Sequence, residues 1–130
     1  MEESIGIIST KRIGLQSIVG IFSSSGYRVW TIARRHGKRK LQREQGSCRA
    51  VVFDVEDEEE YRAEMKKRHA LMHDIKQMDP RIELMCVVSE SICAESCAMG
   101  CTKITGKNRS LSQLRSDIDP VLRRVETKVW

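Results

Sequence analysis

Three polar side chains stand where apolar segments of the sequence end. Asp54 closes the run Ala-Val-Val-Phe-Asp, Ser89 follows an apolar segment that ends at Val88, and Lys107 lies just beyond the segment Cys101–Thr105. In open parallel α/β sheets, ligands bind outside the carboxyl ends of the strands. A carboxylate, a hydroxyl and an amine at such an edge predict a polar ligand-binding site made by Asp54, Ser89 and Lys107.

A second set of side chains has a spacing that suits a metal. Three cysteines and two histidines recur four residues apart, which would stack them on a helix face: Cys93, Cys97 and Cys101, and His69 and His73. Gly100 favours the end of a helix before Cys101, however, and free cysteine often packs as a small buried hydrophobe. Buried thiols are therefore the favoured interpretation and a zinc or iron–sulfur site is the alternative. We expect the two histidines on the solvent side of a long helix.

A basic segment covers residues 34–43 and holds six Lys or Arg side chains: Arg34, Arg35, Lys38, Arg39, Lys40 and Arg43. Such a segment can attract nucleic acid or an acidic partner, but it lacks interleaved aromatic residues and a recognisable binding module. A solvated surface is favoured, with nucleic-acid binding as an alternative.

The later segment from Gly100 to Lys107 is not a phosphate loop. The Walker pattern needs four residues between its glycines and Ser or Thr after the lysine, and here five intervene and Asn108 follows.

The elements that position these side chains alternate along the chain. Apolar, β-branched segments predict strands over residues 4–8, 27–33, 50–54, 82–88 and 101–105. Helical spacing predicts helices over residues 13–22, 58–78 and 91–99 and from Leu111 onward, whereas residues 34–46 are weakly helical at best. Alternating strands and helices favour a five-stranded parallel sheet with helices on both faces.

Length and composition bound the class of protein. The chain has 130 residues, 40% hydrophobic and 32% charged, with a net charge of +5, which fits one soluble globular domain. Residues 1–119 form the expected domain, and residues 120–130 a projecting tail or the start of a linker helix, because Pro120 interrupts the last apolar pattern. Without an apolar span or a secretory signal, we expect a cytoplasmic protein with reduced cysteines and no membrane contact.

The chain resembles the receiver domains of two-component response regulators, of the chemotaxis-regulator type, over nearly its whole length. The segments that carry the resemblance are Arg12–Leu15, Val51–Asp54, Ile75–Lys76 with Asp79–Pro80, Val87–Ser89 and Gly100–Lys107. The resemblance implies a flavodoxin-like (βα)5 fold. It also implies that Asp54 accepts a phosphoryl group, that Lys107 neutralises it and that Ser89 donates a hydrogen bond to a phosphate oxygen.

The sequence departs from the family at the metal pocket. The family has a pair of acids after the first strand, which hold magnesium, whereas this chain has Ser9, Thr10 and Lys11 there. Val55–Glu58 also replaces the usual loop after the phosphoacceptor, although its acids could supply some metal binding. We therefore expect no resident cofactor and a weak or lost magnesium site, with Asp54 as the remaining ligand.

These features predict a regulatory module of signal transduction, a pseudo-receiver that is not an enzyme. It would act through a protein partner or as a homodimer through its last strand and last helix, and it could form the N-terminal part of a transcription regulator. DNA would then be bound only through an effector domain outside this chain. Two alternatives stay open: a working receiver phosphorylated on Asp54 by a sensor kinase, and a nucleic-acid binder that uses residues 34–43.

Overall fold

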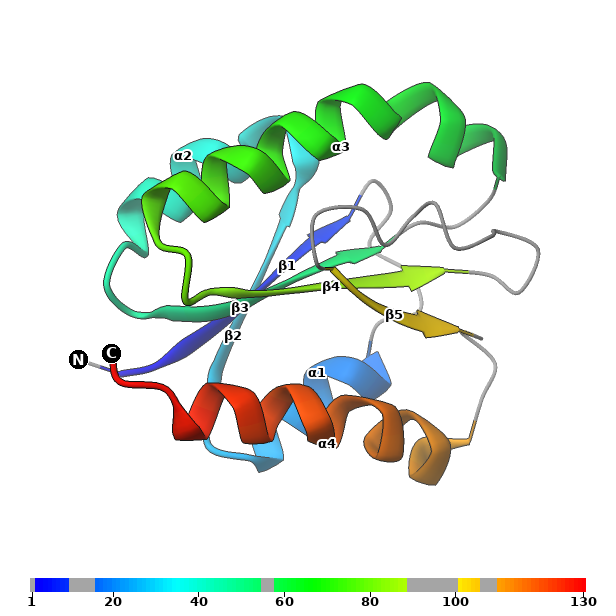
Figure 1. Ribbon diagram of the computed structural model, residues 1–130. Helices are drawn as coiled ribbons and strands as arrows, with labels where there is room; N and C mark the ends of the chain where they lie inside the picture. The colour runs from blue at the N-terminus through cyan, green and yellow to red at the C-terminus, as the bar shows by residue number, and fades with distance from the viewer. Residues whose placement is uncertain (1, 10–15, 55–57, 89–100, 106–109) are drawn as a thin grey trace.

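The computed structural model describes residues 2–9, 16–54, 58–88, 101–105 and 110–130. Within these ranges the chain forms a single sheet of five parallel strands, as the alternation of apolar segments predicts (Figure 1). The strands are β1 (Ser4–Ser9), β2 (Arg28–Ala33), β3 (Cys48–Asp54), β4 (Glu83–Val88) and β5 (Thr102–Thr105).

The strand order is β2-β1-β3-β4-β5, which is the flavodoxin-like order of doubly wound folds. This order makes β2 and β5 the edge strands and puts β1, β3 and β4 in the interior. The interior strands are apolar on both faces, because helices cover both sides of a parallel sheet. The predicted fold class is therefore confirmed.

Helices cover both faces of the sheet (Figure 1). Helices α2 (Gly37–Arg43) and α3 (Glu58–Met78) lie on one face, and α1 (Gln16–Ser24) and α4 (Leu111–Thr127) lie on the other. Helix α1 ends before Gly26, whose φ of 95° is in the left-handed region that glycine adopts without strain. The predicted helix over residues 91–99 lies outside the described residues.

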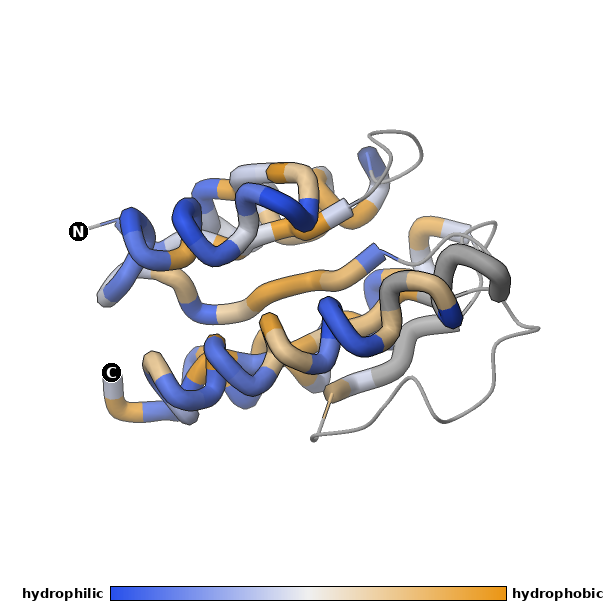
Figure 2. The backbone as a smooth tube through the Cα atoms, turned by 90° about the horizontal axis from the view of Figure 1, so that it is seen from above, coloured by the Kyte–Doolittle hydropathy of each residue, from blue (hydrophilic) through white to orange (hydrophobic). Residues whose placement is uncertain are grey.

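The sheet separates two hydrophobic cores, because successive side chains of a strand point to opposite faces. Ile7, Val52 and Met85 pack toward α1 and α4, whereas Val51 and Phe53 pack toward α2 and α3. Figure 2 shows a hydrophobic strand at the centre of the molecule and, on either side of it, helices in which hydrophobic and hydrophilic residues alternate. Among the described residues, no helix has both the length and the hydropathy that crossing a bilayer requires.

The polar segment after β2 is more helical than expected. A 3-10 turn, η1 (Arg34–His36), leads directly into α2. The sequence shows little amphipathic pattern here because one residue, Leu41, anchors the short helix, and its side chain is only 2% exposed in the core beneath α2 and α3. Tertiary packing of one side chain therefore stabilises a helix that local propensity does not predict.

The expected break at Pro120 is wrong. Helix α4 continues through Pro120 to Thr127, and Val121, Leu122 and Val125 are buried against the sheet. Pro120 itself is exposed, so its ring faces solvent and the buried side of the helix continues past it. Residues 120–130 therefore do not project as a tail.

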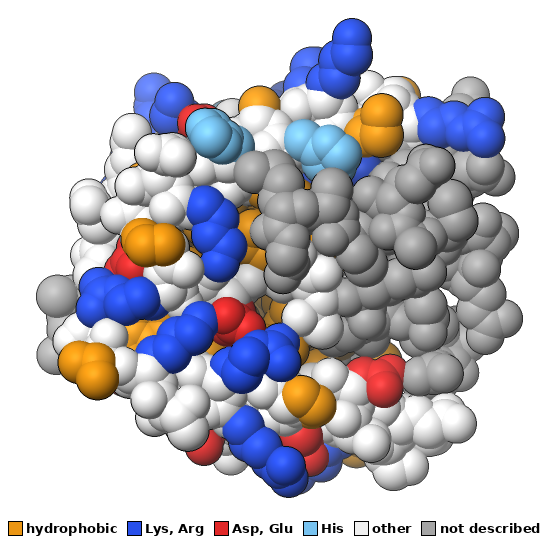
Figure 3. Space-filling model, in the orientation of Figure 1, with side chains coloured by type: hydrophobic (Ala, Val, Ile, Leu, Met, Phe, Trp, Pro, Cys, Tyr) orange, Lys and Arg blue, Asp and Glu red, His pale blue; other side chains and the backbone are white. Residues whose placement is uncertain are grey.

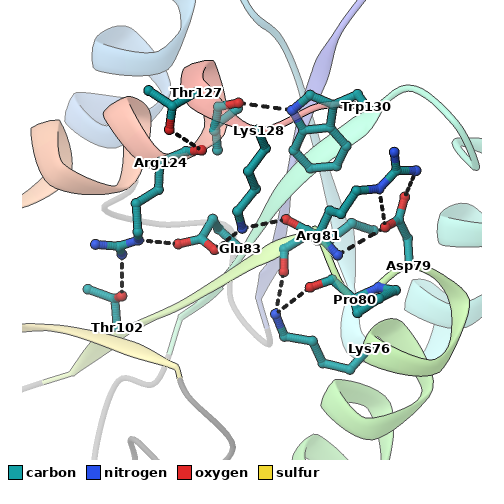
Figure 4. A network of polar contacts seen from close by, with 12 residues as sticks. Lys76, Asp79, Pro80, Arg81, Glu83, Thr102, Arg124, Thr127, Lys128 and Trp130 are labelled. Atoms are coloured by element: carbon teal, nitrogen blue, oxygen red, sulfur yellow. Dashed lines mark hydrogen bonds and ion pairs between the residues drawn. The ribbon is translucent and has the colours of Figure 1, made fainter.

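A network of polar contacts holds the C-terminal residues against the amino ends of the strands (Figure 4). Glu83, at the start of β4, forms ion pairs with Arg124 and Lys128. The indole of Trp130 donates a 2.9 Å hydrogen bond to the carbonyl oxygen of Val125. The guanidinium carbons of two arginines lie near the ring centroid of this indole, at 4.4 Å for Arg49 and 5.2 Å for Arg81. The end of α4 and the residues after it therefore lie at the same end of the sheet as the starts of β3 and β4.

Candidate functional site

The carboxyl edge of the sheet brings together the ends of β1 and β3. These strands are parallel neighbours, and their register pairs Ser9 with Asp54 as the last residues of each strand. On its other side, Asp54 pairs with Val87 of β4. The predicted position of Asp54 at the carboxyl end of a central strand is thus what the fold shows, and Ser9 is its neighbour in the sheet.

A hydrogen bond joins the two side chains. The Ser9 hydroxyl oxygen lies 3.1 Å from Oδ2 of Asp54 and donates its proton to that carboxylate. Both residues are buried, with exposed fractions of 4% for Ser9 and 5% for Asp54. A buried carboxylate is stable only when donors or cations compensate the water that it loses, so Ser9 contributes directly to keeping Asp54 inside the fold.

The remaining predicted site residues lie outside the described part of the chain. These are Ser89 and Lys107, the candidate phosphate-binding residues, together with Thr10 and Lys11. The described strands lead toward the same edge, because Val88 of β4 pairs with Thr105 of β5 in a parallel register. The structure therefore brings Ser9 to Asp54, while the roles of Ser89 and Lys107 stay predictions.

The described donors at this edge do not fit a magnesium ion by themselves. Magnesium takes six oxygen ligands in near-octahedral geometry and is usually bound through one or two carboxylates with water and substrate phosphate. Here the described edge offers one carboxylate, and the neighbouring hydroxyl already donates its proton to it. No cluster of three His, Cys, Asp or Glu side chains forms a candidate metal site among the described residues.

The cysteines that are described lie in the interior. Cys48, Cys86 and Cys101 are free thiols and all are buried. A hydrogen bond with Cys101 lowers the pKa of Cys86; burial opposes this, and the charge of Arg68 adds to the lowering. Arg68 is a buried residue of α3, only 4% exposed, which the sequence analysis did not identify.

The proposed stack of cysteines and histidines is only partly described. Cys101 lies directly before β5 and packs in the core beneath α2 and α3. Cys93 and Cys97 lie outside the described residues. On α3, His73 is exposed as expected, whereas His69 is half-buried. The four-residue spacing of the two histidines therefore does not place both in solvent.

Helix α2 carries most of the basic segment to the surface. Figure 3 shows Lys and Arg side chains along the top of the molecule, above α2 and α3. Lys38 pairs with Asp74 of α3, with 3.6 Å between the ammonium nitrogen and a carboxylate oxygen. Lys40 pairs with Glu44 at 3.3 Å. The basic segment is therefore partly neutralised by neighbouring acids, and Arg35, Arg39 and Arg43 are exposed.

A groove lies between α1 and the start of α4. Its volume is about 480 Å³, and its lining includes Gly20, Ile21, Leu111 and Arg115. Leu111 is 59% exposed, which is unusual for a leucine at the first turn of an amphipathic helix. The predicted interaction face on the last helix thus carries an exposed apolar residue beside a concave surface.

No protein-family model and no curated protein matches the sequence. Solved structures that are similar to it include two response regulators. One is a response regulator receiver domain protein from Clostridium thermocellum, with 16% identity, a TM-score of 0.66, and coverage of 95% of this chain and 97% of that one. The other is a response regulator from Thermotoga maritima, with 14% identity, a TM-score of 0.69, and coverage of 95% and 99%. Together with the strand order and the place of Asp54, these similarities show that the chain has the fold of a response-regulator receiver domain.

Proposed function

We propose that this chain is a receiver-type regulatory module of signal transduction that acts by protein–protein contact, with an Asp54 that is not an ordinary magnesium-dependent phosphoacceptor. The observation that carries the proposal is the buried hydrogen bond between Ser9 and Asp54. Asp54 ends β3, the position at which the resemblance implies a phosphoacceptor, and its neighbour on β1 is a hydroxyl donor and not an acid.

The chemistry of phosphoryl transfer explains why a serine in place of an acid beside Asp54 matters. A phosphoryl group that moves onto a carboxylate spreads negative charge over its oxygens, and a metal ion normally neutralises that charge. Acids beside the phosphoacceptor would hold the metal ion. Ser9 instead donates to the same carboxylate that would have to attack, so it competes with the incoming group for an oxygen of Asp54 and supplies no negative charge for a cation.

An intact-mass experiment tests the phosphoacceptor part. The chain would be incubated with acetyl phosphate and magnesium, beside the variants Asp54→Asn and Asp74→Asn. We expect no gain of a phosphoryl group in the wild type above that in Asp54→Asn. A gain that Asp54→Asn abolishes and Asp74→Asn retains would overturn this part and establish the second candidate, a working receiver phosphorylated on Asp54. The observation that favours this second candidate is the position of Asp54 at the carboxyl end of β3.

The contact surface that we assign to the module is the face of β5 and α4. Supporting it are the exposed side chain of Leu111, the groove between α1 and α4, and the position of β5 as an edge strand of the described sheet. An edge strand and an exposed apolar residue both gain from a partner, because the strand offers unpaired backbone groups and the leucine loses contact with water.

Light scattering during size-exclusion chromatography tests self-association on this face. We expect a mass that rises toward a dimer with concentration in the wild type, and a monomer for Leu111→Glu. Val129→Glu is the matched control, because Val129 is also apolar and exposed, at 88%, but lies at the other end of α4. A monomer for all three proteins would exclude the homodimer, and an equal loss in both variants would place the contact elsewhere.

A further inference from the structure

A small basic pocket lies between the edge strand β2 and helix α2. Its volume is about 190 Å³, and it is lined by Ile32 and by four side chains from the helical segment: His36, Arg39, Lys40 and Arg43. Residues at positions i, i+3, i+4 and i+7 share one face of a helix, so the spacing of these four side chains follows from the helical geometry. The basic segment is therefore not uniformly solvated but has one concave, basic side.

The charges of this pocket are unequally compensated. Lys40 forms an ion pair with Glu44, and its ammonium nitrogen lies 5.7 Å from the ring centroid of Trp30. Arg39 and Arg43 are exposed, and neither forms an ion pair with any residue in the part of the chain that the structure describes. Two guanidinium groups thus border a concavity whose lining contains no carboxylate.

His36 lines the pocket, and one of its ring nitrogens is already engaged in a hydrogen bond. The Nε atom of Arg35 donates a 3.1 Å hydrogen bond to Nε2 of His36, so this imidazole nitrogen acts as an acceptor. The donors that can meet a ligand are therefore the guanidinium groups of Arg39 and Arg43 and the ammonium of Lys40. Ile32 supplies the apolar part of the lining.

The form of these donors selects the chemistry of the ligand. A guanidinium group presents a planar fork of N–H donors that matches two oxygens of a phosphate, and an ammonium adds a point charge. The pocket volume of about 190 Å³ is roughly six times the 30 Å³ that a water molecule occupies in the liquid. That size suits a compact anion with several phosphate oxygens more than a whole nucleotide with its sugar and base.

We propose that the pocket between β2 and α2 binds a compact phosphate-bearing anion of about the size of diphosphate, held by Arg39, Arg43 and Lys40. The lining of this pocket includes neither Ser9 nor Asp54. Strand β2 is at the sheet's edge, and β1 lies between it and β3, which carries Asp54. The inference therefore does not depend on whether Asp54 accepts a phosphoryl group.

Calorimetric titration of the whole chain with sodium diphosphate, at constant ionic strength, tests the site. We expect saturable binding in the wild type and a loss of about tenfold or more in affinity for the double variant Arg39→Gln, Arg43→Gln, because each charge-assisted hydrogen bond is strong. Circular dichroism and thermal unfolding would confirm that the double variant folds, which we expect because both arginines are exposed.

Two variants control for charge and for the other site. Lys38→Gln removes a positive charge from the same helix outside the pocket lining and should keep the affinity within about twofold of the wild type. Asp54→Asn should also bind diphosphate as the wild type does. The proposal is overturned by an absence of saturable binding in the wild type, by an equal loss in Lys38→Gln, or by loss of binding in Asp54→Asn.

A competition experiment separates a small ligand from nucleic acid. A labelled single-stranded oligonucleotide would be added to the wild type with and without excess diphosphate. We expect weak, salt-sensitive binding of the oligonucleotide that diphosphate displaces from the pocket, because both carry the same phosphate chemistry. Tight binding of the oligonucleotide that excess diphosphate leaves unchanged would assign this surface to nucleic acid and overturn the small-ligand site.

Discussion

The Ser9 hydroxyl donates a hydrogen bond to the Asp54 carboxylate across neighbouring strands of the sheet, over 3.1 Å. The contact connects two residues that are 45 positions apart in the sequence, and it lies at the edge where a doubly wound fold binds its ligands. It makes Ser9 part of the candidate site. Its contribution to the free energy of unfolding can be measured without knowing a partner.

Replacing Ser9 by Ala should destabilise the fold. The buried carboxylate of Asp54 loses a donor that water does not replace, so we expect the free energy of unfolding in urea to fall by about 1–2 kcal/mol. Ser23→Ala, at an exposed position of α1, is the control and should change it by less than about 0.5 kcal/mol. Equal effects of the two substitutions would show that the hydrogen bond contributes no net stability.

Two glycines should respond to alanine in opposite directions. A Cβ on Gly6 of β1 would lie 2.2 Å from ring carbons of Trp30, a buried ring that also donates a hydrogen bond to Ser4. We expect Gly6→Ala to lower the free energy of unfolding by about 1–3 kcal/mol or more. On α1, a Cβ on Gly20 meets no atom within 4 Å, so Gly20→Ala should raise the free energy of unfolding by about 0.5–1 kcal/mol.

Chemical denaturation of both variants measures this contrast. The change in near-ultraviolet circular dichroism of the tryptophans reports whether the Trp30 ring moves. A Gly6→Ala variant as stable as the wild type would mean that the ring has another buried position.

The ion pairs of Glu83 predict a loss of stability in acid. Burial would raise the pKa of Glu83, but hydrogen bonds from Lys128 and Arg124 outweigh it and lower the pKa below the ordinary 4.5. Because the folded state binds this proton less readily than the unfolded state, the stabilisation is complete above the ordinary pKa. It declines as the pH falls through the lower folded value.

We therefore expect Glu83→Gln to be less stable than the wild type by about 1 kcal/mol at pH 7, and the difference to shrink below about pH 4. Urea unfolding at a series of pH values measures it. Glu126→Gln, an exposed residue of α4, controls for the loss of one negative charge. A difference between wild type and Glu83→Gln that does not vary with pH would contradict the linkage.

The C-terminal indole should stabilise the fold although it is the last residue of the chain. Trp130 loses its contacts with Arg49 and Arg81 when it is replaced by Ala, and each exposed cation–π contact contributes roughly 0.5–1 kcal/mol. We expect a lower midpoint of thermal unfolding for Trp130→Ala. The adjacent Val129→Ala, at an 88% exposed position, should leave the midpoint unchanged. Equal midpoints for wild type and Trp130→Ala would mean that the contacts of Trp130 contribute nothing to thermal stability.

The buried thiol of Cys48 should resist alkylation in the folded protein. Burial raises the pKa of Cys48 to about 12, so almost none of it is thiolate at pH 8. Iodoacetamide at that pH, followed by peptide mass spectrometry, should leave Cys48 unmodified until urea unfolds the chain. Modification without urea would show that this end of β3 opens readily.

Much of the architecture follows from local patterns. The apolar run that ends in Asp54 and the helix from Glu58 to Met78 both lie where the sequence predicts them, since hydrophobic periodicity and helix-ending residues act over a few positions. The same locality explains the failures. Helix α2 depends on the packing of Leu41, and the helix through Pro120 depends on a buried face that continues on both sides of that residue.

The sequence alone determined that strands and helices alternate, that the sheet is parallel, and that Asp54 stands at the end of a buried strand. Only the tertiary structure decided which side chains meet. Ser9 reaches Asp54 because two strands lie in register, and Trp130 reaches Arg49 and Arg81 because α4 ends beside the amino ends of β3 and β4. Such contacts join residues that are distant in sequence, so they depend on strand order and register, which no local pattern specifies.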